Sequence, residues 1–419
     1  MKLYAFGYLS PNISNPKQTP PPSSGSIPTC ILEAHAIKIL WSSWCDVLIA
    51  YKAIPEGPWA IDYRGTSLSP AQEAYITNSP AIKNALGNER HSLHPFGSDL
   101  HHGLQGCIIS DPNGKDSELV VFSTAIEIEN GAPALQTLRV PEKWNMTAIH
   151  MDSRGDVLAA VVSKCTGEGH TSRFTDLKDL HEHLEKDALD SPCAQKKLAS
   201  FSPAQWRTNR TTSIALNTHG HVFTASSDSR YQKCLGRPST HAPAFEAVPY
   251  FEETRLRKIA AGGYMVAAIS SDDELFLWGQ ANPGCHAGLS VLGTQDGEGG
   301  GADKVARIRQ GTTTRVSVSV GYQDEVIKSL EVFIDGEEAR PYDVVIGNGH
   351  VIVAAEVQKA DGTTRRAVLG AGSNDRLQTG VPLRSAFVQD FEEIVALGDT
   401  TIEEMVAAGW TTFVVTSEN

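Results

Sequence analysis

Short apolar runs that end at turn residues recur along the whole chain. Clear examples are residues 47–50, 107–109, 119–122 and 351–354. Runs of this length, bounded by Gly, Asp and Ser, are typical of buried strands in an all-β fold. Helical patterns are few: one covers about residues 175–197 and a shorter one covers about residues 70–86. The pattern therefore predicts an all-β fold with short helical insertions.

Many of these runs pair up around a tight turn. In the clearest unit, residues 259–269 are predicted to form one strand, 271–273 a turn, and 274–279 a second strand ending in Gly. Similar hairpins have turns at 153–155, 218–220 and 361–362, and weaker copies surround Asn113-Gly114 and Glu56-Gly57. Asp-Gly and Asn-Gly supply the positive φ that two-residue hairpin turns require. These units predict repeated antiparallel hairpins.

The turns recur at intervals that fit one structural repeat. Their positions are Gly57, Gly114, Gly155, Gly220, Asp273 and Gly362. A unit of about 50–60 residues with about four strands has the size of a propeller blade. The longest interval, between Asp273 and Gly362, predicts a loop insertion at about 285–340. The helical pattern predicts another insertion at about 165–200.

The two ends of the chain complement each other. Residues 406–416 copy the first half of the unit at 259–269 and stop there, whereas Leu3-Tyr4-Ala5-Phe6-Gly7 parallels its second half, residues 275–279. Pairing of the N-terminal strand with the C-terminal strands would close a ring and remove an exposed sheet edge. Six turns and one split unit predict seven blades in a single domain spanning residues 1–419.

The repeat resembles that of the RCC1 (regulator of chromosome condensation) superfamily. Gly347-Asn348-Gly349-His350 keeps the family's Gly-x-x-His order, and residues 230–238 and 370–380 resemble its Trp-Gly-x-Asn…Gln-Leu-Gly stretch. Ser42 and Ser43 stand where the family's Gly is expected. The resemblance implies a seven-bladed β-propeller. Family members include an exchange factor for a small nuclear GTPase, ubiquitin-ligase subunits and adaptors, so the fold alone leaves the function open.

Charge narrows the choice of partner. The chain has 36 Lys and Arg against 49 Asp and Glu, a formal net charge of −13. An acidic chain lacks the basic footprint of nucleic-acid or anionic-membrane binding, so a protein partner is expected, with neither direct nucleic-acid nor membrane contact. The founding exchange factor docks chromatin through a basic tail, whereas residues 1–30 contain only Lys2 and Lys17 as basic residues.

The resemblance accordingly points most closely to the fungal alpha-tubulin-suppressor type of RCC1-like protein. That type partners a small zinc protein in diphthamide synthesis and Elongator-dependent modification of tRNA wobble uridine. We therefore expect a non-enzymatic adaptor or regulatory subunit, acting as a monomer or heterodimer. Two alternatives stay open: an exchange factor for a small nuclear GTPase, and an RCC1-like partner of a chromatin-modifying JmjC-type oxygenase.

Targeting signals and cysteine usage indicate the compartment. No stretch approaches the roughly 18–20 apolar residues of a membrane span, and the N-terminus lacks the apolar core of a secretory signal. The cysteines are seven in number, widely spaced, and form no Cys-x-x-Cys motif. Reduced thiols of this kind predict a cytoplasmic or nuclear protein.

No group of residues predicts catalysis, a metal site or a cofactor. The histidine pairs 181/183, 219/221 and 101/102 lack further ligands, and no His-Glu-x-x-His motif occurs. The Gly-rich segment 297–301 lacks the Gly-Lys-Ser/Thr of a phosphate loop, and no Gly-x-Ser-x-Gly nucleophile elbow is present. Adjacent acids such as Glu252-Glu253 and Glu392-Glu393 are typical of solvated surfaces.

Three aromatic residues are the candidate binding residues. Trp44, Tyr264 and Trp410 fall at comparable places near the start of the predicted inner strands. Packing between blades is one interpretation of their position. The other is that loops at one end of the ring present them to a protein partner, since Trp and Tyr are common interface anchors.

Overall fold

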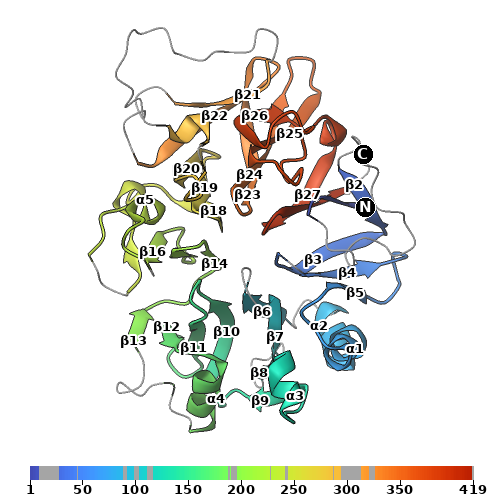
Figure 1. The fold of residues 1–419 in the computed structure, drawn as a ribbon, viewed down its shortest axis with the longest axis vertical. Coiled ribbons are helices and arrows are strands. Elements are labelled where there is room, and N and C mark those ends of the chain that lie inside the picture. Colours follow the sequence, from blue (N-terminus) through green and yellow to red (C-terminus); the bar gives the residue numbers. More distant parts are fainter. Residues whose placement is uncertain are drawn as a thin grey trace.

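The computed structural model of the protein is a ring of antiparallel sheets with a few short helices (Figure 1). It describes residues 1–8, 28–44, 46–87, 92–98, 103–110, 117–186, 189, 196–226, 228–240, 244–285, 287–293, 313–319 and 326–417. The sheets follow one another around the ring in chain order, and the first and last strands lie side by side. The prediction of an all-β propeller with short helical segments is confirmed.

Five of the sheets have three or four strands, the size of a propeller blade. The first is the closing sheet, with β1 (Lys2–Gly7), β2 (Thr29–Glu33), β27 (Thr401–Ala408) and β28 (Thr411–Ser417). The three-stranded sheet has β3 (Ala36–Ser42), β4 (Asp46–Lys52) and β5 (Ala60–Gly65). The next has β6 (Ser92–Ser98), β7 (Gly103–Ser110), β8 (Ser117–Phe122) and β9 (Leu135–Arg139).

The remaining strands form two more blades and one larger sheet. The blades are β10 (Trp144–Met151), β11 (Val157–Ser163), β12 (Gly169–Phe174) and β13 (Lys196–Ala199), and then β14 (Gln205–Thr208), β15 (Thr212–Leu216), β16 (Val222–Ser226) and β17 (Glu246–Ala247). The nine-stranded sheet has β18 (Leu256–Gly262), β19 (Met265–Ser270), β20 (Leu275–Gly279), β21 (Arg315–Val318), β22 (Lys328–Ile334), β23 (Glu337–Ile346), β24 (His350–Gln358), β25 (Thr364–Ser373) and β26 (Phe387–Glu393).

The count of seven separate blades is not what the structure shows: the described residues form five separate blades and the nine-stranded sheet. The difference arises in the predicted insertion at about 285–340. Strand β22 pairs with β20 along one edge, and at Val332–Ile334 it pairs with Ala339–Glu337 of β23. A strand of the insertion thus joins two hairpin units that the repeat spacing had separated.

The ring closes as predicted. Strand β1 pairs antiparallel with β28 over its whole length, from Lys2 opposite Thr416 to Gly7 opposite Thr411. On its other edge, β1 pairs with β2. Alternate residues of β1 and β28, including Leu3 and Phe413, are fully buried against β3 and β4. Pairing leaves β28 without a free edge, because β27 occupies its other side.

The predicted hairpins form, with one correction inside the repeat unit. Strands β10–β11, β15–β16 and β24–β25 pair as expected, as do β4–β5 around Glu56-Gly57. The turn at Asn113-Gly114 and the Gly-rich segment 297–301 lie outside the described residues. Residues 259–269 are not one strand, however: β18 and β19 are separate strands joined at Gly263 and Tyr264. Gly263 adopts a φ of 54°, which permits the reversal.

Helices lie outside the sheets and come largely from two regions (Figure 1). The region predicted as one helix at about 70–86 contains α1 (Pro70–Asn78) and α2 (Pro80–Gly87), separated where Ser79 precedes Pro80. The insertion at about 165–200 contains α4 (Leu177–Glu185), flanked by β12 and β13. The shorter helices are α3 (Ala125–Glu129), α5 (Gln232–Leu235), and the 3-10 turns η1 (Pro249–Phe251), η2 (Ser290–Leu292) and η3 (Val395–Leu397).

Two histidines link neighbouring sheets, one fully buried and the other partly buried. The Nε2 of His350 on β24 lies 2.9 Å from the Oγ1 of Thr412 on β28, and His350 is fully buried. His150 on β10 contacts the hydroxyl of Thr208 on β14 and stacks on Trp206. Burial lowers the pKa of each imidazole to about 3, with the positive charge of Arg207 as a further cause at His150. Both histidines are therefore neutral at physiological pH.

Candidate interaction face

The three aromatic residues singled out in the sequence lie in the same kind of turn. Trp44 stands between β3 and β4, Tyr264 between β18 and β19, and Trp410 between β27 and β28. Each turn joins the first strand of a meander to its second. The expectation of comparable positions is therefore correct, although the residues are in turns rather than at the start of strands.

These turns contact one another in an arc. The backbone N–H of Arg210, between β14 and β15, donates to the carbonyl of Gly263 at 2.8 Å, and the N–H of Asn348, between β23 and β24, donates to the carbonyl of Gly409 at 2.6 Å. A Cβ on Gly409 would lie 2.5 Å from that of Trp44. We call residues 209–211, 263–264, 347–349, 409–410 and 43–44 the inner-turn arc.

One end of the arc carries an exposed aromatic cluster. Trp410 and Tyr8 are each 38% exposed, and the N–H of Tyr8 donates to the carbonyl of Trp410 at 2.9 Å. The hydroxyl of Thr411 donates to the carbonyl of Tyr8 at 2.5 Å. The guanidinium of Arg376 lies 5.7 Å from the ring centre of Tyr8. Backbone hydrogen bonds thus join the two exposed aromatic residues, and a cation lies beside one of their rings; we call Tyr8, Trp410 and Arg376 the first cluster.

Tyr264 belongs to a second cluster that also combines two aromatic residues with one arginine. Its ring centre lies 4.9 Å from that of Tyr231, and the guanidinium of Arg230 lies 5.6 Å from Tyr231. Burial, and then the neighbouring Tyr231, raise the pKa of Tyr264. Arg230 pairs with Asp228 at 2.6 Å, which fixes its direction. We call Arg230, Tyr231 and Tyr264 the second cluster.

The structure brings two of the three predicted residues together and leaves the third apart. Trp44 and Trp410 lie in adjacent turns, whereas the turn at 347–349 separates Trp410 from Tyr264 along the arc. Trp44 is half-buried beside Gly409, and Trp410 is exposed. Trp44 is thus less exposed than Trp410, and both stay predicted binding residues.

A buried carboxylate anchors one end of the arc. Asp46 is fully buried, and its Oδ1 accepts from the Tyr63 hydroxyl at 2.6 Å and from the N–H groups of Thr66 and Ser67 at 3.1 Å. Its Oδ2 accepts from the Ser67 hydroxyl at 2.5 Å and the N–H of Leu104 at 3.1 Å. Burial, and then Asp46, raise the pKa of Tyr63. With five donors, Asp46 is a structural link between two sheets.

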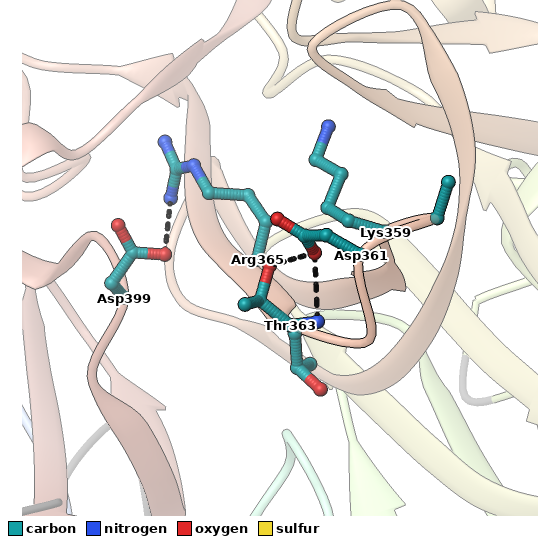
Figure 2. A pocket seen from close by; sticks show the side chains of 7 residues that line it. Lys359, Asp361, Thr363, Arg365 and Asp399 are labelled. Atoms are coloured by element: carbon teal, nitrogen blue, oxygen red, sulfur yellow. Dashed lines mark hydrogen bonds and ion pairs between the residues drawn. The ribbon is translucent and has the colours of Figure 1, made fainter.

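A separate cleft of about 660 Å³ lies where the β24–β25 hairpin faces the residues before β27 (Figure 2). Arg365 in this cleft bonds to Asp399 at 3.1 Å and to Glu393 at 2.6 Å. Asp361 accepts from the N–H and hydroxyl of Thr363 at 2.9 and 2.6 Å. Lys359 pairs with Asp335 and Glu337. In Figure 2 the guanidinium of Arg365 binds the carboxylate of Asp399, and the carboxylate of Asp361 binds Thr363 of its own hairpin.

Comparison with known proteins identifies the architecture. No protein-family profile and no curated protein sequence matches the chain. Its whole length is similar to Prp20p from Saccharomyces cerevisiae, studied for its binding to Gsp1p and histones, with a TM-score of 0.59, 10% identity and 92% of that chain covered. It is also similar over its whole length to human WBSCR16 (TM-score 0.55, 10% identity, 100% covered) and to yeast RCC1 (Prp20) bound to Kap60 (0.55, 10%, 89%). The chain has the fold of the RCC1-type propellers.

The histidine pairs of the sequence are the remaining candidates for metal ligands. In the part of the chain that the structure describes, no three His, Cys, Asp or Glu side chains are grouped as metal ligands. His183 contacts Asp179 and His181 contacts Glu185 on helix α4, while His101 and His102 lie outside the described residues. No helix among the described ones is long and apolar enough to cross a membrane.

Sequence reasoning missed four members of the two clusters of this RCC1-type propeller. Tyr8 and Arg376 are far apart in the chain and meet only because the ring closes. Tyr231 and Arg230 stand in the segment already noted for its family resemblance, next to a hairpin rather than within one. The adjacent pair Arg230-Tyr231 is a local signal that could have found the second cluster.

Proposed function

We propose that this RCC1-type propeller is a non-enzymatic protein-interaction subunit, an adaptor or regulator, that binds its partner through the inner-turn arc. The observation that carries the proposal is the pair of aromatic–arginine clusters at this arc. Trp, Tyr and Arg are the residues that most often dominate binding energy at protein interfaces.

The ordered backbone of the arc supports a binding role for its exposed side chains. Trp410 and Tyr8 share a backbone hydrogen bond, and neighbouring turns are bonded to each other through Gly263 and Gly409. Side chains on a pre-ordered backbone lose less conformational entropy on association, so more of their contact energy appears as affinity. The cleft of Figure 2 is lined by as many basic as acidic side chains, Lys359 and Arg365 with Asp361 and Asp399, so its charge does not favour one kind of partner.

Affinity purification of the full-length chain followed by mass spectrometry tests the proposal. The double variant Trp410→Ser with Tyr231→Ser removes one anchor from each cluster, and Ile126→Ser changes an exposed apolar residue on α3 as the matched control. We expect the double variant to recover its specific partner about tenfold less than the wild type does, with the control unchanged. Equal recovery by all three proteins would refute an interface at the arc.

Within this class, we propose a role with a small zinc protein in diphthamide synthesis and Elongator-dependent tRNA modification. The support is the sequence resemblance of Leu3-Tyr4-Ala5-Phe6-Gly7 and of the chain's size to the fungal alpha-tubulin-suppressor type. Native purification should recover the zinc protein in a complex of defined stoichiometry. Its absence would exclude this role while leaving the wider proposal intact.

A second candidate is exchange activity on a small nuclear GTPase. The likeness to Prp20p, which binds Gsp1p and histones, favours this test. The purified chain would have to speed the release of a fluorescent guanine nucleotide from such a GTPase. Unchanged release would exclude exchange activity. Recovery of an oxygenase instead of either partner would favour the third possibility, an oxygenase subunit.

We also propose that residues 1–419 make one domain and that the nine-stranded sheet represents two joined blades. Strands β18, β19 and β20 form one antiparallel meander, and β23 to β26 form another. Only β22 connects them along the sheet. Counted in this way, the ring has seven blades. Limited proteolysis that releases no stable fragment would support one domain.

A further inference from the structure

A pocket at the other end of strand β4 has a different character from the inner-turn arc. The loop between β4 and β5 and the helix α2 enclose about 590 Å³, lined by Lys52, Gly57, Pro58, Trp59, Lys83, Asn84 and Gly87. The inner turn at Trp44 precedes β4 and this loop follows it. Seven strand residues at about 3.3 Å each separate the two sites by roughly 20 Å.

Two lysines lie beside the indole of Trp59, and a third lines the same pocket. The Nζ of Lys38 lies 5.2 Å and that of Lys52 lies 5.4 Å from the ring centre, and Lys83 lines the same pocket. None of the three forms an ion pair with a carboxylate in the described part of the chain. The positive side chains in the cleft of Figure 2 are, by contrast, paired with acids.

The acids near the pocket compensate part of this positive charge. Glu56 is exposed in the loop. Glu404 accepts the N–H of Ile39 at 2.9 Å; burial raises its pKa, and the positive charge of Lys38 is among the causes that lower it. Three ammonium groups grouped together in a chain of net charge −13 make a local positive site on an acidic protein. Charge complementarity selects a negatively charged ligand.

The loop also presents an apolar side chain beside these cations. Ile54 is 63% exposed, and the N–H of Gly57 donates to its carbonyl at 3.0 Å, which closes a turn. Pro55 stands within this turn and Pro58 follows it, and both restrict φ. A small inorganic anion would satisfy the lysines and leave Ile54 and Trp59 in water, whereas a peptide that carries both carboxylates and an apolar residue would cover all of them.

We propose that Lys38, Lys52, Lys83, Trp59 and Ile54 form a second docking site, the lysine–tryptophan pocket, for an acidic peptide segment of a partner protein. The carboxylates of the peptide contact the ammonium groups, and an apolar residue of the peptide packs on Ile54 and the indole edge. This site goes beyond the interface proposed at the inner-turn arc and would allow the propeller to hold two protein segments at once.

Fluorescence anisotropy with the full-length chain tests the pocket. The probe is a fluorescein-labelled peptide of Glu-Glu-Leu repeats, and a Gln-Gln-Leu peptide of the same length is its control. The variant Lys52→Gln with Lys83→Gln removes two pocket charges. Lys178→Gln with Arg384→Gln removes two exposed charges elsewhere and serves as the matched control. Trp59→Phe keeps an aromatic ring, and Trp59→Ser removes it.

The expected result is binding of the Glu-Glu-Leu probe that weakens with added NaCl and falls about tenfold in the pocket double variant, as two ion pairs of about 0.7 kcal/mol each predict. The control double variant and Trp59→Phe should stay within about twofold of the wild type, while Trp59→Ser weakens binding. Thermal unfolding of each variant shows whether the fold is intact.

Three results would overturn the proposal. The first is absence of probe binding, or equal binding of the Gln-Gln-Leu peptide. The second is lysine-dependent binding of pyrophosphate without peptide binding, which would assign the pocket to a free anion. The third is concentration-dependent dimer formation in sedimentation that disappears in the pocket variant, which would make a second copy the occupant. Trp410→Ser with Tyr231→Ser should leave probe binding unchanged, which separates this test from that of the inner-turn arc.

Discussion

Mild acid should weaken this fold through two histidines that link neighbouring sheets. His350 and His150 are both enclosed between sheets, and burial holds the pKa of each at about 3, against about 6.5 in an unfolded chain. The Nδ1 of His350 has no hydrogen-bond partner in the described structure, so the N–H formed by protonation would have no acceptor. Protonation therefore favours the unfolded chain.

The size of the effect follows from the two pKa values. Below pH 6.5 the unfolded chain binds a proton at each histidine that the folded chain does not bind, so stability falls as the pH falls, until about pH 3. At about 1.36 kcal/mol for each pH unit, the change from pH 7 to pH 5 removes about 2 kcal/mol per histidine and about 4 kcal/mol for the pair. The stability is fully present above pH 7.

Urea unfolding at pH 7 and pH 5, followed by tryptophan fluorescence, measures this loss. His350→Gln removes one titrating group, so its pH-dependent loss should be about 2 kcal/mol smaller than that of the wild type. His150→Gln gives an independent measure of the same kind, and His219→Gln changes an exposed histidine as the control. If His350→Gln and His150→Gln both keep the full pH dependence of the wild type, the buried neutral imidazoles are not its source.

Three further perturbations probe the links between sheets. Gly347→Ala would place a Cβ against the His350 ring and should cost about 2 kcal/mol in urea unfolding, whereas Gly288→Ala, whose Cβ would make an ordinary contact with Ala281 at 3.8 Å, should cost far less. Asp46→Asn replaces an acceptor of five donors by a partial donor and should cost about 3 kcal/mol; an unchanged melting temperature would contradict its structural role. Removal of residues 1–7 exposes the edge of β28 and should produce self-association in gel filtration, and a monomer of unchanged stability would argue against the closing sheet.

Most of the fold could be predicted from local sequence patterns. Turn residues with apolar runs on both sides located the hairpins β10–β11, β15–β16 and β24–β25, because hairpin formation depends on neighbouring residues. Closure of the ring was also predictable, since the two ends of the chain carry complementary halves of one repeat.

Features that depend on distant pairing were not predictable. The turn at Gly263 and Tyr264 is a local feature that was missed for another reason: it lies inside the apolar run 259–269, where no polar residue marks it. The bridging strand β22 depends on pairing with two strands that belong to different units. At the candidate face, Trp410 was found from the repeat, but Tyr8 and Arg376 become neighbours only in three dimensions.

Because β1 pairs with β28, the closing sheet can form only after the last strand has been synthesised. At about 5–20 residues per second, Lys2–Gly7 is made roughly 20–80 s before Thr411–Ser417. For that interval one edge of β1 has no native strand beside it, and the sheets of the nascent chain form an open arc. Completion of the ring is therefore a late, single event, and a chain truncated before residue 411 would display an unpaired strand edge to chaperones and proteases.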